Sequence, residues 1–313
     1  MLRVDLAERG TVMRHGLGWR THRVLLGTAF VISLFAAPAA PAMAAVVTCG
    51  TVVTASITLT SDLGPCPGDA LIAGADNITI DLGGYTISGT GADTNTGAGV
   101  RVAQRTGVTV TNGTILGFHT GVVLDEATNS KVSKLVLRDN IRGVNVAGSN
   151  GSLVEKNTIL NSGLDAIRLG LSDNNIISKN TLSGNVFGIG VADGSTGNLV
   201  EKNVIRGTRG FGIAVFSDSD SNRIEKNDVQ RTLQGDGINV SIDSSLTLIF
   251  KNVANLNGDD GIDTDNPRTT ITGNIANNNG DLGIEAVVGT TDGGGNLASG
   301  NGNPAQCAEV MCS

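Results

Sequence analysis

Two acidic turns near the C-terminal end of the chain carry the residues best suited to chemistry. Paired carboxyl groups can supply the general acid and the general base of glycoside hydrolysis, and inverting enzymes hold them about 6.5–9.5 Å apart. The turns read GDGI at 235–238 and GDDGI at 258–262, so the candidate catalytic residues are Asp236, Asp259 and Asp260. Asp-Gly pairs also form ordinary surface turns, and a solvated acidic face is the favoured interpretation.

The same stretch of the chain could hold a metal ion. Clustered carboxylate oxygens are the hard ligands that calcium prefers. The candidate ligands are Asp260, Asp263, Asp265 and Glu285. Calcium is the only cofactor that the residues indicate.

A repeat of 22–25 residues places these turns within a larger pattern. Each period contains three short stretches with Val, Ile or Leu at every second position, which is typical of strands whose alternate side chains point inward. Such short strands cannot bury their apolar side alone, so each turn must stack on the next. A small residue followed by Val or Ile marks each period, at Gly99, Gly121, Gly143, Ala166, Gly188, Gly212, Gly237, Gly261 and Gly283.

An asparagine recurs once per turn, where the chain must bend between two strands. Asn tolerates left-handed backbone angles, and its amide both donates and accepts hydrogen bonds, so stacked copies can form a ladder along the axis. We interpret these residues as structural; they are Asn157, Asn180, Asn203, Asn227, Asn252 and Asn274. A leucine-rich solenoid is the alternative, but its Leu-rich signature is missing.

The repeats, together with the segment DNITIDLGGYTISG at 76–89, resemble the right-handed parallel β-helix repeat proteins of the pectate-lyase-like superfamily. The resemblance implies an all-β fold, a single-stranded right-handed parallel β-helix of about nine to ten turns over residues 77–289. Residues 45–76 would form an N-terminal cap and residues 290–313 a C-terminal cap. No activity follows from the fold, because the superfamily includes polysaccharide lyases, glycoside hydrolases, epimerases, tailspikes and adhesins.

The acidic turns further resemble the aspartate arrangement of polygalacturonase-type hydrolases, in which one turn has a single Asp and the next has a Gly-Asp-Asp run. That family also uses a His on the following turn and an Arg/Lys pair beyond it. Here the following turn reads DLGIE at 281–285, and neither feature is present. The resemblance therefore gives only partial support to a catalytic role for the three aspartates.

Residues 1–44 have the pattern of a secretory signal peptide. Five arginines precede an uncharged apolar run at 24–37, and Ala42-Met43-Ala44 provides the small residues of a cleavage site. The run is shorter than the roughly 18 residues that a membrane span needs. We expect cleavage after Ala44 and a secreted, extracellular product without a membrane anchor, whether translation starts at Met1 or Met13.

Charge and cysteine content agree with export. Residues 45–313 contain 17 basic and 27 acidic side chains, a formal charge of −10 that argues against nucleic acid as a partner. The four cysteines form two local pairs at opposite ends of the repeats, and an exported protein can keep disulfides. The stack separates the two ends too far for cross-pairing, so we predict the bridges Cys49–Cys66 and Cys307–Cys312.

These features are most consistent with a secreted, non-catalytic protein, either a scaffold or a module that binds glycans or surfaces. The expected partner is a polysaccharide or a cell-surface glycan. The alternatives are a polysaccharide lyase, hydrolase or epimerase that uses the acidic turns, and a calcium-stabilised adhesin-like module. Phe187 and Phe211 share one repeat position, for which interior or turn packing is the favoured interpretation. Surface ion pairs are the favoured interpretation of Arg101, Arg142 and Arg168.

Overall fold

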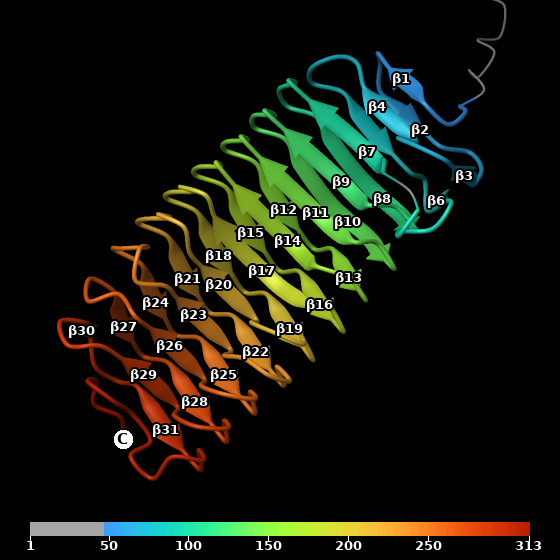
Figure 1. Ribbon diagram of the computed structural model, residues 1–313. Helices are drawn as coiled ribbons and strands as arrows, with labels where there is room; N and C mark the ends of the chain where they lie inside the picture. The colour runs from blue at the N-terminus through green and yellow to red at the C-terminus, as the bar shows by residue number, and fades with distance from the viewer. Residues whose placement is uncertain (1–46, 95) are drawn as a thin grey trace, which may run out of the picture. The chain divides into compact units, whose positions relative to one another are not determined.

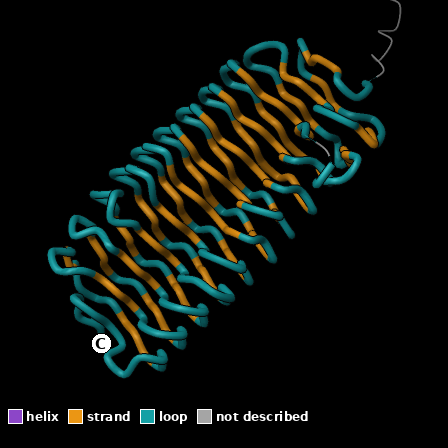
Figure 2. Tube along the Cα trace, in the orientation of Figure 1, coloured by secondary structure: helices purple, strands orange, loops and turns teal. Residues whose placement is uncertain are grey.

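The computed structural model describes residues 47–94 and 96–313. The predicted signal peptide lies outside these residues. The described chain forms 31 β-strands and turns, without a helix, and every strand pairing is parallel (Figures 1 and 2). It follows that these residues contain no helix capable of crossing a membrane.

The strands coil into three parallel sheets, and each turn of the coil gives one strand to each sheet. Sheet 1 has eleven strands in chain order: β1 (Thr51–Val53), β4 (Leu71–Ala73), β7 (Ala98–Ala103), β9 (Thr120–Asp125), β11 (Arg142–Ala147), β14 (Asp165–Gly170), β17 (Phe187–Ala192), β20 (Ile213–Val215), β23 (Ile238–Val240), β26 (Ile262–Thr264) and β29 (Ile284–Ala286). The β-helix prediction is thus confirmed, with slightly more turns than the nine to ten expected.

Sheets 2 and 3 share two long strands, β8 (Thr109–Leu116) and β10 (Lys131–Arg138), whose first halves lie in sheet 2 and second halves in sheet 3. The other strands of sheet 2 are β2 (Ile57–Thr58), β5 (Thr79–Asp81), β12 (Leu153–Glu155), β15 (Ile176–Ser178), β18 (Leu199–Glu201), β21 (Arg223–Glu225), β24 (Leu248–Phe250), β27 (Thr270–Thr272) and β30 (Thr291–Asp292). Those of sheet 3 are β3 (Leu63–Cys66), β6 (Thr86–Gly89), β13 (Thr158–Leu160), β16 (Thr181–Ser183), β19 (Val204–Arg206), β22 (Asp228–Gln230), β25 (Val253–Asn255), β28 (Ile275–Asn277) and β31 (Leu297–Ser299).

The core is a set of columns of like side chains inside the coil. In-register pairing aligns one inward-facing column in sheet 1: Ile189, Ile213, Ile238, Ile262 and Ile284. All five are essentially inaccessible to solvent. Burial of one large aliphatic side chain contributes roughly 1.5–3 kcal/mol, so stacked columns of this kind are the main source of stability.

The predicted asparagine ladder runs along the corner between sheets 2 and 3. Each side chain donates from Nδ2 to Oδ1 of its equivalent on the next turn, over 3.0–3.2 Å, from Asn157 through Asn274 to Asn296. Oδ1 also accepts the backbone N–H of the preceding copy, as Asn203 does from Asn180. The left-handed residue of this corner is the one before each asparagine, for example Lys202 with φ 55°, and not the asparagine itself.

The small residue of the repeat lies where the chain enters sheet 1. A Cβ at Gly237 would lie 2.6 Å from the carbonyl oxygen of Gly261 on the next turn, which is closer than the atoms can approach. Glycine therefore allows the turns to pack at this corner, and the recurrence of a small residue in the sequence follows from that contact.

Disulfides lie near both ends of the coil. Cys49–Cys66 joins β3 to the turn before β1, with the Cα atoms 5.4 Å apart, and Cys307–Cys312 closes a loop after β31, with the Cα atoms 6.2 Å apart. The C-terminal loop also pairs with the last turn through bridges from Cys307 to Ile284 and from Cys312 to Asn296. These bridges pair part of the strand edge at this end.

Candidate functional site

The outer face of sheet 1 is hollowed where its side chains become small. Register places five residues in one outward-facing column over successive turns: Arg168, Gly190, Ala214, Asn239 and Asp263. Gly190 and Ala214 leave the middle of this column almost without side chains. A depression is therefore built into the sequence between Arg168 and Asn239.

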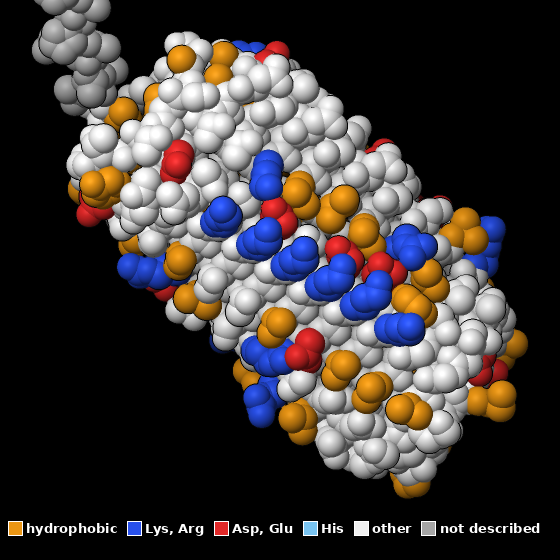
Figure 3. All heavy atoms as spheres, turned by 180° about the vertical axis from the view of Figure 1, so that it is seen from behind, with side chains coloured by type: hydrophobic (Ala, Val, Ile, Leu, Met, Phe, Trp, Pro, Cys, Tyr) orange, Lys and Arg blue, Asp and Glu red, His pale blue; other side chains and the backbone are white. Residues whose placement is uncertain are grey.

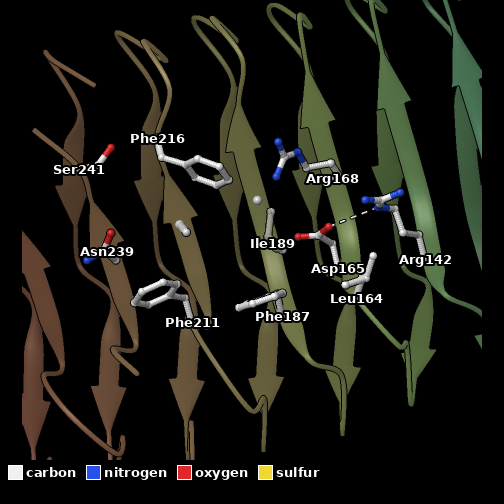
Figure 4. Close-up of a pocket in the computed structure, with 12 residues that line it drawn as sticks. Arg142, Leu164, Asp165, Arg168, Phe187, Ile189, Phe211, Phe216, Asn239 and Ser241 are labelled. Atoms are coloured by element: carbon white, nitrogen blue, oxygen red, sulfur yellow. Dashed lines mark hydrogen bonds and ion pairs between the residues drawn. The ribbon is translucent and has the colours of Figure 1, made fainter. Parts of the chain in front are cut away.

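Aromatic side chains form the walls of this depression. Phe187 and Phe211 line one side and Phe216 lines the other (Figure 4). The resulting cavity has a volume of about 400 Å³. Phe187 and Phe211 are half-buried, so neither ring packs in the interior of the coil, and each lies against a glycine of the following turn, Gly210 and Gly235 respectively.

Basic residues lie at the N-terminal side of the cavity, and each is held by an ion pair. Arg142 contacts Asp165 at 3.4 Å, and Arg168 contacts Asp193 at 2.9 Å. The Arg168 guanidinium also lies 4.8 Å from the ring centre of Phe216, which positions it as part of the wall. The predicted surface ion pairs are present, because Arg101 pairs with Asp69 as well.

A second hollow of about 470 Å³ continues toward the C-terminal turns. It shares Phe187, Phe211 and Asn239 with the first, and its remaining lining includes Asp236 and Asp263. We call the two hollows together the sheet 1 groove. Arg142 and Arg168 lie at one end of the groove, aromatic rings lie in the middle, and carboxyl groups lie at the other end, where Arg209 also lines the second hollow.

Hydrogen bonds fix the carboxyl groups at the acidic end. Asn239 donates from Nδ2 to Oδ2 of Asp236, at 3.1 Å, and to Oδ2 of Asp263, at 2.8 Å. Oδ1 of Asp236 accepts the backbone N–H of Asp260, at 3.1 Å. Oδ1 of Asp260 accepts the backbone N–H of Leu282, at 2.6 Å, so Asp260 is tied to the turn below.

Burial makes these carboxyl groups weak acids. Loss of water raises the pKa of Asp236 to about 6, although the hydrogen bonds from Asp260 and Asn239 oppose the change. Burial, followed by the charges of Asp236 and Asp265, raises the pKa of Asp263 to about 7. Burial and a side-chain hydrogen bond with Glu285 raise the pKa of Asp260 to about 8. Near neutral pH the cluster therefore retains protons that it can donate.

Only two of the three predicted catalytic residues line the sheet 1 groove. Asp236 and Asp259 line the sheet 1 groove, whereas Asp260 is only 4% exposed and does not line it. Asp263, which the sequence suggested as a metal ligand, lines the groove beside Asp236. The proximity of Asp263 to Asp236 follows from pairing between β23 and β26, which the repeat phase already implies.

Asp236, Asp259 and Asp260 each place one carboxylate oxygen within 4.8 Å of an oxygen of the other two. This set shares only Asp260 with the four predicted calcium ligands. Asp265 and Glu285 are exposed at the rim, and Glu285 contacts Asp260. The oxygen donors would suit a hard cation such as calcium, provided that their protons are displaced.

We expect the melting temperature to fall by about 5 °C between pH 5 and pH 8.5. Folding raises the pKa of these carboxyl groups, so their protonation stabilises the folded state. The stabilisation is complete when the pH is below the pKa of the unfolded chain, about 3.9. It is lost as the pH rises through the pKa of the folded protein. For Asp236, Asp263 and Asp260 that window extends to about 6, 7 and 8. Differential scanning fluorimetry with a chelator present measures the effect.

Asp260→Asn should flatten this pH dependence, whereas the exposed Asp218→Asn, which removes an equal charge, should not. A melting temperature that stays level or rises over the same pH range in the wild type would contradict the burial of protonated carboxyl groups. Repeating the series with millimolar calcium tests the metal site, because a bound cation would hold the carboxylates ionised and remove the dependence.

Comparisons with known proteins agree with the geometry of the coil. The family model described as "Right handed beta helix region" matches residues 71–229. No curated protein matches the chain by sequence. Among solved structures, a mutant of the periplasmic alginate epimerase AlgG superposes with a TM-score of 0.64 at 14% identity, covering 80% of this chain and 71% of that one.

Two phage proteins are similar in the same way. The Dettilon tailspike protein has a TM-score of 0.63 at 20% identity and covers 84% of this chain. A double mutant of the tailspike of E. coli bacteriophage HK620 has a TM-score of 0.60 at 16% identity and covers 83%. This chain spans 60% and 59% of the two tailspikes, less than two thirds of their length. At these identities the likeness shows the fold alone.

Proposed function

Because this chain belongs to the right-handed β-helix family, we propose that it is a glycan-binding protein whose sheet 1 groove holds an oligosaccharide. The observation that carries this proposal is the groove itself. Its three phenylalanine rings face an open cavity, and charged side chains lie at both ends. Aromatic faces with a few fixed polar groups are the usual composition of a site for a small organic ligand.

The chemistry of the groove suits a sugar chain in particular. Phe187, Phe211 and Phe216 offer apolar faces against which the C–H faces of pyranose rings can pack. Asn239, Ser241 and the carboxyl groups offer acceptors and donors for hydroxyl groups. The groove extends along the axis of the coil, so successive sugars would lie on successive turns.

The structural neighbours support the same proposal. One of them is a periplasmic alginate epimerase, and others are phage tailspikes. Two disulfides in this chain are consistent with a location outside the cytoplasm, where such bonds persist. We propose secretion on these grounds together with the predicted signal peptide.

A glycan-cleaving enzyme is the second candidate, and the raised pKa of Asp263 is the observation that favours it. A carboxyl group with a pKa of about 7 can act as a general acid at neutral pH. Asp236, which shares Asn239 with it, would be the base or the nucleophile. Under this candidate Asp263→Asn abolishes cleavage and leaves binding intact.

A glycan array tests the proposed function. We expect the wild type to bind one class of glycan and Phe187→Ala/Phe211→Ala to lose at least tenfold of that signal. Leu297→Ala, which removes an exposed apolar side chain on sheet 3 away from the groove, should bind normally. Equal binding by the wild type and the double variant would refute the groove as the site.

Reducing-sugar and unsaturated-uronate assays on the bound glycans separate the two candidates. Release of new chain ends by the wild type, but not by Asp263→Asn, would replace the binding module with the enzyme.

A further inference from the structure

Six of the seven lysines of the chain form one column at the corner where sheet 2 passes into sheet 3. Each lysine directly follows a residue of sheet 2 that pairs with its equivalent on the next turn. Successive lysines are therefore separated by one strand spacing, about 4.8 Å. All six side chains are exposed, and Figure 3 shows a row of basic side chains along the coil with acidic ones beside it. The members of this lysine column are Lys134, Lys156, Lys179, Lys202, Lys226 and Lys251.

The backbone of the corner does not account for the choice of lysine. All six residues have φ between 54° and 57°, a left-handed conformation that favours glycine and asparagine. Neighbouring turns use those residues at the same position, Asn112 before the column and Gly273 after it. Lysine is therefore present at this corner against the local conformational preference, six times in succession.

Local ion pairs neutralise only part of the column. Glu155 pairs with Lys156, Glu201 with Lys202 and Glu225 with Lys226. Among the described residues, Lys134, Lys179 and Lys251 have no carboxylate partner. Lys131 and Arg223 add further positive charge, each in contact with one of the same glutamates. The column is thus a line of excess positive charge on a chain whose formal charge is −7.

We propose that the lysine column is a second binding surface, which holds a linear anionic polysaccharide along the axis of the coil. A rigid line of cations at strand spacing matches a single extended chain with one negative charge per sugar. A membrane or a duplex would meet the surrounding acidic surface as well as the line. Single-stranded nucleic acid is bound through a series of aromatic rings, and within the described part of the chain Phe250 is the only ring with a cation–π contact to the column.

This surface is independent of the proposed glycan site in the sheet 1 groove. The corner between sheets 2 and 3 lies across the coil from sheet 1, and no member of the lysine column lines either hollow. Ala214→Trp, which fills the groove, should leave binding at the column unchanged. Failure of one site therefore does not imply failure of the other.

The test variant is Lys179→Asn/Lys202→Asn/Lys226→Asn. Asparagine accepts the left-handed backbone, so the fold should be retained, and circular dichroism with the melting temperature verifies this. The probe is an oligogalacturonate long enough to span the column, titrated by calorimetry at about 50 and 200 mM salt. We expect the triple variant to lose about tenfold or more in affinity at the lower salt and about half of the salt dependence.

The matched control is Arg105→Gln/Arg231→Asn/Arg268→Gln, which removes the same charge away from the column. It should bind the probe within about twofold of the wild type. The proposal is overturned if the wild type does not bind the probe at the lower salt, or if both triple variants lose affinity equally. The proposal is also overturned if the wild type binds a deoxythymidine oligomer or phosphatidylserine vesicles more tightly than the probe. The ligand of the column would then be a nucleic acid or a membrane, respectively.

Discussion

Asn203→Ala is expected to lower the free energy of unfolding by about 3–4 kcal/mol. Asn203 is fully buried, and its Oδ1 accepts both the backbone N–H and the Nδ2 of Asn180, each at 3.0 Å. Its own Nδ2 donates to the carbonyl oxygen of Ile177, at 2.8 Å, and to Asn227. Alanine would leave two donors and a carbonyl group buried without these partners, in the middle of a ladder whose bonds polarise one another.

Urea denaturation followed by circular dichroism measures this loss. The matched control is Asn145→Ala on the outer face of sheet 1, where the half-exposed side chain makes no hydrogen bond to the described residues. The control should change the free energy of unfolding by no more than about 0.5 kcal/mol. Similar values for the two variants would mean that the ladder contributes nothing beyond an ordinary turn.

Ala214→Trp is expected to weaken glycan binding by more than tenfold while the fold is retained. Ala214 faces outward between Gly190 and Asn239, on the floor of the 400 Å³ cavity. An indole there would occupy the space between Phe211 and Phe216 and would exclude a sugar ring. Because the side chain points away from the core, the melting temperature should change little.

Calorimetric titration with the glycan selected on the array measures this effect. Ala147→Trp is the matched control. Ala147 also faces outward on sheet 1, at the end of β11, but it lies outside the groove lining. The control should bind like the wild type. Unchanged affinity in Ala214→Trp would place the ligand elsewhere on the coil.

The coil itself could be predicted because its signal repeats. The isoleucine column of sheet 1 follows from the phase of the repeat, and the register of the structure confirms it. The small-residue motif misses the first turns, because β1 and β4 lie in residues 51–73, before the motif begins at Gly99. The Asn ladder was expected, but the left-handed lysine before each asparagine is a detail of the backbone that composition does not reveal.

The groove could not be predicted from any single turn. It requires two small residues, Gly190 and Ala214, at the same position on adjacent turns, with phenylalanines beside them. Comparing outward positions across turns would have found it. The weak acidity of Asp236, Asp260 and Asp263 depends on burial and on the turn below, so the sequence pointed to an acidic cluster but not to its protonation.

The decisive test of the proposed glycan site is a crystal structure of the protein with the oligosaccharide that gives the strongest array signal at physiological salt. We expect sugar rings in the sheet 1 groove, packed on Phe187 and Phe211, with hydroxyl groups hydrogen-bonded to Asn239 or Asp263. Sugar bound only at sheets 2 and 3, or at either end of the coil, would contradict the proposed site.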